Sequence, residues 1–257
     1  FSNAVTTISI DELTPARLGA LMALYAIGDL HLCLGAPKPM DVFGEAWKNY
    51  VQRLEESFSH LHEDDVTVLC GDLSWGMSLE ESLEDFRFID RIPGKKILLK
   101  GNHDYWWTTV AKMERFFDAH GLHSMQILHN NCLTYGDYAL CGTRGWFYEL
   151  DHHGTHNEKV LLREIGRLET SLRQAGDREI LCFLHYPPLY QGYYCPEILR
   201  LLREYKVKQC YYGHLHGQSH RRAIEGPWNG TDFSLVSADY LQFVPKKIDL
   251  DTKKCGN

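Results

Sequence analysis

Five apolar runs of this sequence are each followed directly by side chains that can bind a metal ion. These side chains belong to Asp29-x-His31, Gly71-Asp72, Gly101-Asn102-His103-Asp104, His185 and Gly213-His214-x-His216. Carboxylate oxygens, imidazole nitrogens and amide oxygens are ligands for Zn, Mn or Fe. The candidate ligands are two carboxylates, four histidines and an asparagine: Asp29, Asp72, His31, His185, His214, His216 and Asn102. One tetrahedral zinc ion needs only four ligands, so this set predicts a site for two divalent metal ions (Mn, Fe or Zn) if one carboxylate bridges them.

Each block taken alone has an ordinary structural explanation. Gly, Asn and Asp are common turn residues, so Gly101-Asn102-His103-Asp104 could be a polar turn, and a lone histidine at the end of a strand is more often a core or surface residue. The five blocks together are harder to explain by packing, because ligands collect at the carboxyl ends of strands in open α/β sheets. Side chains two apart on an extended strand point the same way, so Asp29 with His31, and His214 with His216, are expected to converge.

The elements that must hold these blocks alternate between strands and helices in the first half of the chain. Apolar runs predict buried strands at 23–27, 66–70 and 97–99. Helical spacing of apolar residues predicts helices at 43–61, 79–89 and about 108–119. This repeat is typical of a sheet with parallel strands and crossover helices.

The pattern changes in the second half of the chain. Short strands at 126–128, 132–135 and 138–141, separated by turn residues, suggest antiparallel hairpins. Further elements are expected as helices at 157–174 and 197–204, and as strands at 179–184, 209–212, 219–224, 232–236 and 248–250. Because there is no Pro/Ser-rich linker, repeat or low-complexity tract, we expect residues 22–257 to form one domain with two sheets.

Residues 1–21 are expected to be an amino-terminal extension outside that domain. Ser2-Asn3-Ala4 resembles the scar left by tag removal, and Met22 could be a natural start. The longest apolar stretch nearby, residues 18–28, is too short to span a bilayer, and Asp11 and Glu12 do not fit a basic export leader.

The composition narrows the functional class. A formal charge of −7 argues against a general nucleic-acid-binding surface, and 14 histidines are many for 257 residues. None of the eight cysteines forms a Cys-x-x-Cys pair, and several lie in apolar runs where free cysteine acts as a small hydrophobe. We therefore expect a reducing, cytoplasmic setting without membrane association.

The order of the five blocks resembles that of the calcineurin-like metallophosphoesterase family, from Ala26 to His216. The resemblance implies an α/β fold, a four-layer sandwich of two mixed β-sheets flanked by helices, with a dinuclear metal site at the strand ends. It places one set of side chains on the first metal: Asp29, His31 and His216. It places a second set on the other metal: Asn102, His185 and His214. Asp72 would bridge both ions, and His103 would face the substrate without binding a metal.

The sequence departs from the protein-phosphatase branch of that family at one position. There the bridging aspartate belongs to Gly-Asp-x-x-Asp-Arg-Gly, whereas Trp75 stands here in the place of the second aspartate. The departure argues against a catalytic histidine supported by that aspartate, and against protein phosphatase activity.

We expect a hydrolase that cleaves phosphoester bonds of a small substrate. Two cations about 3.5–4 Å apart would neutralise the phosphate, and a hydroxide bridging them would attack phosphorus in line. His103 could bind a phosphoryl oxygen or protonate the leaving alkoxide. Asp104 is expected to support the site or to cap a helix. Arg144, in Gly142-Thr-Arg-Gly-Trp146, could hold a phosphate oxygen or be a surface arginine in a turn.

Two other functions remain open at this point. A phosphodiesterase acting on nucleotides or cyclic nucleotides competes with a phosphomonoesterase. More remotely, the chain could be a catalytically silent interaction scaffold on the same fold. The sequence does not indicate an oligomeric state.

Overall fold

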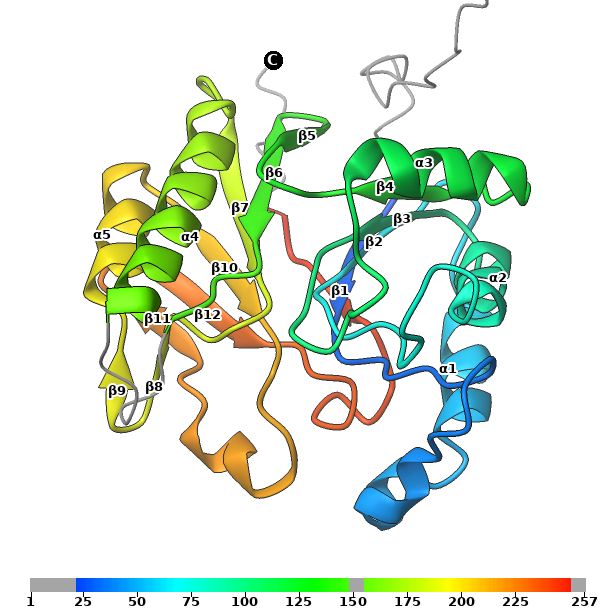
Figure 1. Ribbon diagram of the computed structural model, residues 1–257. Coiled ribbons are helices and arrows are strands. Elements are labelled where there is room, and N and C mark those ends of the chain that lie inside the picture. The colour runs from blue at the N-terminus through cyan, green and yellow to red at the C-terminus, as the bar shows by residue number, and fades with distance from the viewer. Residues whose placement is uncertain (1–21, 148–154, 251–257) are drawn as a thin grey trace, which may run out of the picture.

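Two large β-sheets lie face to face between two groups of helices in the computed structural model, which describes residues 22–147 and 155–250 (Figure 1). Helices α1, α2 and α3 cover one outer side of the pair of sheets, and α4 and α5 cover the other. This arrangement confirms the predicted four-layer sandwich of two mixed sheets flanked by helices.

The first sheet carries the earliest metal-type blocks. Its strands are β1 (Leu24–Ile27), β2 (Val66–Leu69), β3 (Lys95–Leu98), β4 (Met125–Ile127) and β13 (Lys246–Lys247), in the order β13-β1-β2-β3-β4. The strands β1 to β4 are parallel, and β13 is antiparallel to β1. The register pairs Ile27 with Leu69 and Leu69 with Leu98, so three strands end level with one another. The chain therefore leaves all three at one edge of the sheet.

The helices of the first half of the chain pack on the outer face of this sheet. They are α1 (Tyr50–Phe58), α2 (Leu83–Arg91) and α3 (Val110–Ala119), preceded by the short 3-10 helices η2 (Met40–Phe43) and η3 (Glu45–Trp47). Each of the three α-helices connects two neighbouring parallel strands, as the alternating pattern predicts.

The second sheet carries the later blocks. Its strands are β5 (Cys132–Tyr135), β6 (Tyr138–Thr143), β7 (Glu179–Leu184), β10 (Gln209–Tyr212), β11 (Gly226–Trp228) and β12 (Thr231–Leu235), in the order β11-β12-β10-β7-β6-β5. The four central strands are parallel, and β5 and β11 run antiparallel at the edges. The helices α4 (Thr155–Arg173) and α5 (Pro196–Glu204) cover its outer face. A small hairpin of β8 (Leu189–Tyr190) and β9 (Tyr193–Tyr194) precedes α5.

Alternation along the strands creates three apolar layers. In β1, Ala26 lies between the two sheets, whereas Ile27 packs against the helices of the first half. In β7, Phe183 lies between the sheets, whereas Leu184 packs under α4 and α5. Successive side chains of a strand point to opposite faces, so one strand serves two cores. Both sheets are thus buried on both faces, which holds their strand ends in fixed positions.

Most predicted elements are confirmed, but several details were wrong. The helix expected at 43–61 is divided into η2, η3 and α1, because Asn49 takes a left-handed conformation directly before α1. Residues 126–128 do not join an antiparallel hairpin, since β4 pairs in parallel with β3 in the first sheet. The pattern at 219–224 is not a strand but the 3-10 helix η4 (Gly217–Arg222), and 248–250 is not a strand because pairing with β1 ends at Lys247.

Four strands were not predicted, namely β8, β9, β11 and β13. All four are two or three residues long, and β11 contains Pro227, which fits only an edge strand. Residues 1–21, expected to be an extension, lie outside the described residues. The assignment of 22–257 to one domain stays a prediction.

The cysteines of the described chain are unpaired. Cys33, Cys70, Cys132, Cys141, Cys182, Cys195 and Cys210 are free. Cys132, Cys141, Cys182 and Cys210 are register partners across four adjacent strands, where they pack beneath the helices as small hydrophobes. Within the described residues, no helix has the length and apolar character needed to cross a membrane.

Replacing Phe86 by Ala tests the packing of α2 on the first sheet. The Phe86 ring is fully buried and contacts Trp106 and Phe117, with ring centroids 4.8 and 5.2 Å away. We expect the change to lower the free energy of unfolding by about 3–5 kcal/mol, measured by urea denaturation. Phe43→Ala is the matched control, because that ring is 66% exposed, and it should cost less than about 0.5 kcal/mol. Equal losses in the two variants would contradict the assignment of this core.

Candidate metal centre

All five predicted blocks meet where the carboxyl ends of the two sheets come together. Within the first sheet, the backbone N–H of Asp29 donates to Gly71 O (2.8 Å), and that of His31 donates to Asp72 O (2.9 Å). Within the second, Gly213 N–H donates to His185 O (3.0 Å). Across the sheets, the N–H of His214 donates to the Asp29 carboxylate (2.9 Å). The loops are therefore bonded to one another as well as to their own strands.

Two glycines allow these loops to approach so closely. A Cβ atom on Gly101 would lie 2.0 Å from Asp72 Oδ1, and one on Gly213 would lie 2.4 Å from Asp29 Oδ2. Either side chain would occupy the space of a candidate ligand. The glycines before the Asn-His-Asp and His-x-His blocks are thus needed for clearance.

The backbone at the ligands is not extended, so the expected reason for convergence was wrong. Asp29, His31, Asp72 and His214 all take positive φ values, at 58°, 46°, 51° and 72°. Asp29 and His31 do converge, but through left-handed turns rather than through strand alternation. Such conformations are costly for residues other than glycine, and they cluster at functional sites.

The first group of donors consists of Asp29, His31 and His216. One donor atom of each lies within 4.8 Å of the others. His216 Nε2 lies 3.4 Å from Asp29 Oδ1 and 3.4 Å from His31 Nε2. These are the three residues predicted for the first metal, and the fold brings them together.

The second group is centred on His185. His185 Nε2 lies 2.7 Å from Asn102 Oδ1 and 3.5 Å from Asp72 Oδ2, and the ring of His214 lies 5.1 Å from the His185 ring. Asp72 Oδ2 also lies 3.9 Å from His31 Nε2. Asp72 is therefore between the two groups, where a bridging carboxylate must be.

The donors fit a pair of cations. Asp29 Oδ1 is buried, and it has no hydrogen-bond partner among the described residues. It makes ion-pair contacts with His216 (3.4 Å) and His185 (3.8 Å) that are longer than hydrogen bonds, and a cation among the surrounding donors would compensate its burial more closely. Hard oxygen and borderline nitrogen donors without thiolates suit Mn, Fe or Zn.

Burial keeps His31 and His214 in the form that binds metal, whereas His216 is protonated beside two carboxylates. Burial lowers the pKa of His31 and of His214 to about 3, so each imidazole is neutral and carries a free lone pair at pH 7. Burial, assisted by the charge of Asp29, raises the pKa of Asp72 well above its usual range. Burial alone would lower the pKa of His216, but the charges and hydrogen bonds of Asp29 and Asp239 together outweigh burial and raise it to about 10.

Asp104 holds the loops after β2 and β3 in place. Its buried carboxylate accepts hydrogen bonds from the backbone N–H groups of Gly101 (2.7 Å), Asp72 (2.9 Å) and Leu73 (2.8 Å), and from the indole of Trp106 (3.0 Å). The alternative that Asp104 caps a helix was wrong, since the residue at the N-cap of α3 is Thr109.

Asp239 is a supporting residue that sequence reasoning missed. Its carboxylate accepts from the N–H of Gly217 (3.0 Å) and pairs with His216 Nδ1 (2.9 Å) and His220 Nε2 (3.2 Å). A carboxylate on the far nitrogen of a ligand histidine fixes the ring orientation. The signal was present, because Ser237-Ala-Asp239 follows the strand predicted at 232–236 as a sixth polar strand end.

His103 lies beside the donors on an aromatic wall. Its ring centroid is 4.6 Å from that of Trp75, and Trp75 also stacks on His31 at 5.0 Å. Lys38 Nζ lies 3.9 Å from the centre of the Trp75 ring. His103 Nδ1 is buried with no hydrogen-bond partner among the described residues. Trp75 therefore supports the histidine by packing where the protein-phosphatase branch has an aspartate.

Arg144 lies at the end of β6, next to His185 in the fold. Its backbone oxygen accepts from the N–H groups of His185 (3.2 Å) and Tyr186 (2.9 Å), and its side chain lines a cavity beside the candidate metal centre. It is partly buried, so the alternative of a surface arginine in a turn describes it less well.

Comparisons with known proteins agree with this geometry. Among solved structures, phosphopantetheinyl hydrolase (PptH) from Mycobacterium tuberculosis has a TM-score of 0.56 and 15% identity, over 93% of this chain and 100% of that chain. A protein of unknown function (AQ665) from Aquifex aeolicus has a TM-score of 0.46 and 14% identity, over 88% and 95%. At these identities the first similarity shows a shared fold, and the weaker one carries no argument. No curated protein sequence matched the chain.

The family comparison is decisive for classification. A model of the calcineurin-like phosphoesterase family matches residues 22–218, which is more than half of the chain and includes all the predicted ligands from Asp29 to His216. The chain therefore belongs to the calcineurin-like phosphoesterase family.

Proposed function

We propose that this protein is a hydrolase that cleaves phosphoester bonds of small substrates with the help of two divalent metal ions (Mn, Fe or Zn). The observation that carries the proposal is the pair of largely buried donor groups, Asp29 with His31 and the partly exposed His216, and Asp72 with His185 and the partly exposed Asn102. Family membership supports the same reaction class. Two such ions would neutralise a phosphate and activate water at neutral pH.

The residues of the chain divide the remaining work. Asp72, which reaches both donor groups, would hold the two ions at a fixed separation. Asp104 and Asp239 would keep the ligand loops and the His216 ring in orientation. Burial lowers the pKa of His103, so its imidazole is neutral in the free protein. A bound phosphate would favour the protonated form, which can donate to a phosphoryl oxygen or to the leaving alkoxide.

The substrate class is tested with 4-nitrophenyl phosphate and bis(4-nitrophenyl) phosphate. Faster hydrolysis of the diester would favour the alternative of a phosphodiesterase acting on nucleotides or cyclic nucleotides. If neither ester is hydrolysed, and elemental analysis finds less than about one metal per chain after reconstitution, the scaffold alternative replaces the proposal.

Asp72→Asn tests the bridging ligand. The amide keeps the shape but removes the negative charge, so we expect metal content and kcat/KM to fall together, the latter by about 100-fold or more. Elemental analysis and ester hydrolysis measure the two effects. Asp118→Asn, on the exposed side of α3, is the control and should change neither. Full activity of Asp72→Asn with two metals bound would refute the bridging role.

His103→Ala separates catalysis from metal binding. Because His103 is proposed to touch the phosphate but no metal, kcat should fall by about 10²–10⁴-fold while both metals stay bound. The exposed His123→Ala is the matched control. Loss of metal in His103→Ala would show that the residue is a ligand, and unchanged kcat on every hydrolysed ester would remove it from the mechanism.

Metal removal should make stability more sensitive to pH. In the metal-free protein, Asp72 and His216 have raised pKa values, so between pH 7 and 8.5 they keep protons that the unfolded chain has already released at lower pH. Folding then takes up protons, so the stability of the metal-free form should fall as pH rises, by about 1–2 kcal/mol. Metal ions displace these protons, so the increase in Tm on adding Mn²⁺ should be larger at pH 8.5 than at pH 7. An increase independent of pH would contradict the role of these two groups.

A further inference from the structure

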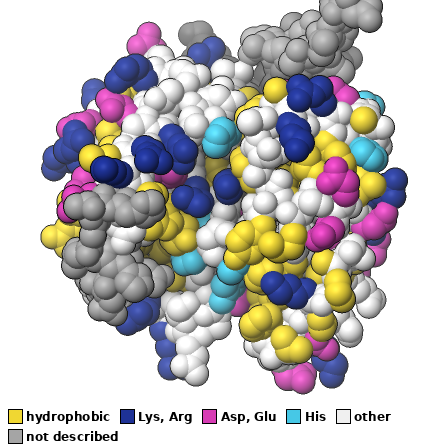
Figure 2. Space-filling view, viewed as in Figure 1, with side chains coloured by type: hydrophobic (Ala, Val, Ile, Leu, Met, Phe, Trp, Pro, Cys, Tyr) yellow, Lys and Arg dark blue, Asp and Glu magenta, His cyan; other side chains and the backbone are white. Residues whose placement is uncertain are grey.

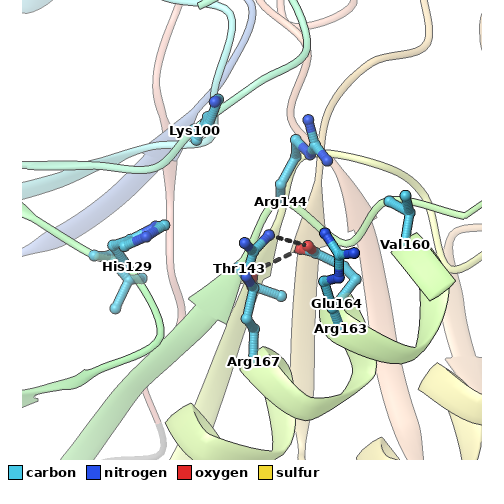
Figure 3. Close-up of a pocket in the computed structure, with 9 residues that line it drawn as sticks. Lys100, His129, Thr143, Arg144, Val160, Arg163, Glu164 and Arg167 are labelled. Atoms are coloured by element: carbon cyan, nitrogen blue, oxygen red, sulfur yellow. Dashed lines mark hydrogen bonds and ion pairs between the residues drawn. The ribbon is translucent and has the colours of Figure 1, made fainter. Parts of the chain in front are cut away.

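The polar cavity that Arg144 lines is shown in Figure 3. Its volume is about 280 Å³, roughly that of nine water molecules at about 30 Å³ each. Lys100 and His129 lie on one side of it, the α4 residues Arg163 and Arg167 lie on the other, and Arg144 lies between them. The remaining lining residues are Leu128, Thr143, Val160 and Glu164.

The cavity carries an excess of positive charge. Four cationic side chains face one carboxylate, and burial, with the nearby Arg167, lowers the pKa of His129 so that this ring is neutral. Lys and Arg side chains also gather near the middle of this face, above histidines in the hollow between the two halves (Figure 2). Such a concentration of like charge is unfavourable unless an anion lies among the cations.

Glu164, the one carboxylate among these lining residues, accepts hydrogen bonds from the protein on both of its oxygens. Glu164 is almost completely buried, and its Oε1 accepts from the hydroxyl of Thr143 (2.6 Å) and from Gly145 N–H (2.9 Å). Its Oε2 accepts from Arg167 (3.1 Å). Within residues 22–147 and 155–250, no carboxylate forms an ion pair with Lys100, Arg144 or Arg163. Among the described residues, these three cations are therefore not neutralised by a carboxylate and can bind an anionic ligand.

Arg144 is held in place before any ligand arrives. Its carbonyl accepts the backbone hydrogen bonds of His185 and Tyr186, and the next residue, Gly145, is bonded to buried Glu164. Its Nε is buried and has no partner among the described residues. The backbone is thus fixed, and the guanidinium keeps donors with which it can hydrogen-bond the oxygens of a phosphoryl group.

The cavity shares its wall with the candidate metal centre. Lys100 lies two positions before Asn102, and Arg144 bonds directly to the backbone of His185. Asn102 and His185 are the donors of the second group. These two links place the cavity next to the second donor group.

We propose that this cavity binds a second phosphoryl group, belonging to a substrate whose scissile phosphoester lies at the metal centre. The inference rests on the proposed function, and it narrows the substrate to small molecules with two phosphate groups separated by a short linker. Arg144, Arg163 and Lys100 would hold the group that is not cleaved.

A homologous series of substrates tests the inference. Straight-chain alkanediol bisphosphates with two to six carbons are compared with the alkyl monophosphates of the same length, and phosphate release is measured. We expect one linker length to give a kcat/KM at least about tenfold above its monophosphate, because a charge-assisted hydrogen bond is gained. The best length measures the distance between the two phosphate positions.

Arg163→Gln removes one cation from the cavity at a distance from the candidate ligands. It should lower kcat/KM for the best bisphosphate by about tenfold and leave that for the monophosphate unchanged. Arg173→Gln is the matched control on the same helix, since this exposed side chain pairs with Glu169 outside the cavity. Equal rates for bisphosphates and monophosphates in the wild-type protein, or no effect of Arg163→Gln on their ratio, would overturn the inference.

A binding measurement separates this inference from the proposed function. An alkyl phosphonate, which cannot be hydrolysed, is titrated calorimetrically into metal-free protein, so that the cavity rather than a metal ion offers cations to it. Binding that is weakened in Arg163→Gln but not in Arg173→Gln supports the cavity as a phosphoryl site, even if no ester is hydrolysed. Absence of any Arg163-dependent binding in the metal-free protein, together with an absence of bisphosphate preference in hydrolysis, refutes it.

Discussion

The burial of Asp29 and Asp72 at the joined edge of two sheets is the constraint on which the rest of this structure depends. Both carboxylates are almost completely inaccessible to solvent. A buried carboxylate without compensation is costly, so every neighbouring element must supply positive charge, donors or a cation. The histidines of four different loops and the backbone N–H groups of His103 and His214 supply part of it. The rest of the compensating positive charge would come from two bound metal ions.

The same constraint explains the unusual backbone around the site. Left-handed conformations at Asp29, His31, Asp72 and His214 cost stability, and closely approaching loops allow no Cβ at Gly101 or Gly213. Such geometry persists only if the surroundings determine it. Asp104 does so for the first sheet, where one carboxylate accepts the N–H groups of two successive strand ends. The stability of the two packed sheets therefore offsets the conformational cost of the strained loops.

Trp75 packs against His103 in this protein, whereas the protein-phosphatase branch has an aspartate at that position. Packing against the Trp75 ring, tilted by 46°, orients the His103 ring without adding negative charge, and Lys38 Nζ lies over the same indole. A histidine without a carboxylate partner responds to the charge of the bound ligand. The positive cavity at Arg144 adds to the same picture, since both features favour a substrate with more than one negative charge.

Sequence alone was sufficient for the class of fold, for the strand ends that carry the site and for the identity of the candidate ligands, because apolar strand periodicity and the ligand blocks are local signals. Asp239, the hairpin of β8 and β9, and the division of the first long helix were not predictable, because they depend on contacts between distant segments. Short edge strands have too few residues for a periodic pattern. The sequence correctly indicated that Asp29 and His31 converge, but for the wrong reason. They converge through left-handed turns and not through the alternation of an extended strand.

Tertiary structure decided what surrounds the ligands. Arg144, Arg163 and Lys100 are far apart in the chain and belong to three different segments, so only the packing of α4 beside β6 makes them one cavity. Residue types and local order specify which atoms can bind metal. The charge and shape of the cavity beside them depend on contacts between distant segments, which no local sequence pattern predicts.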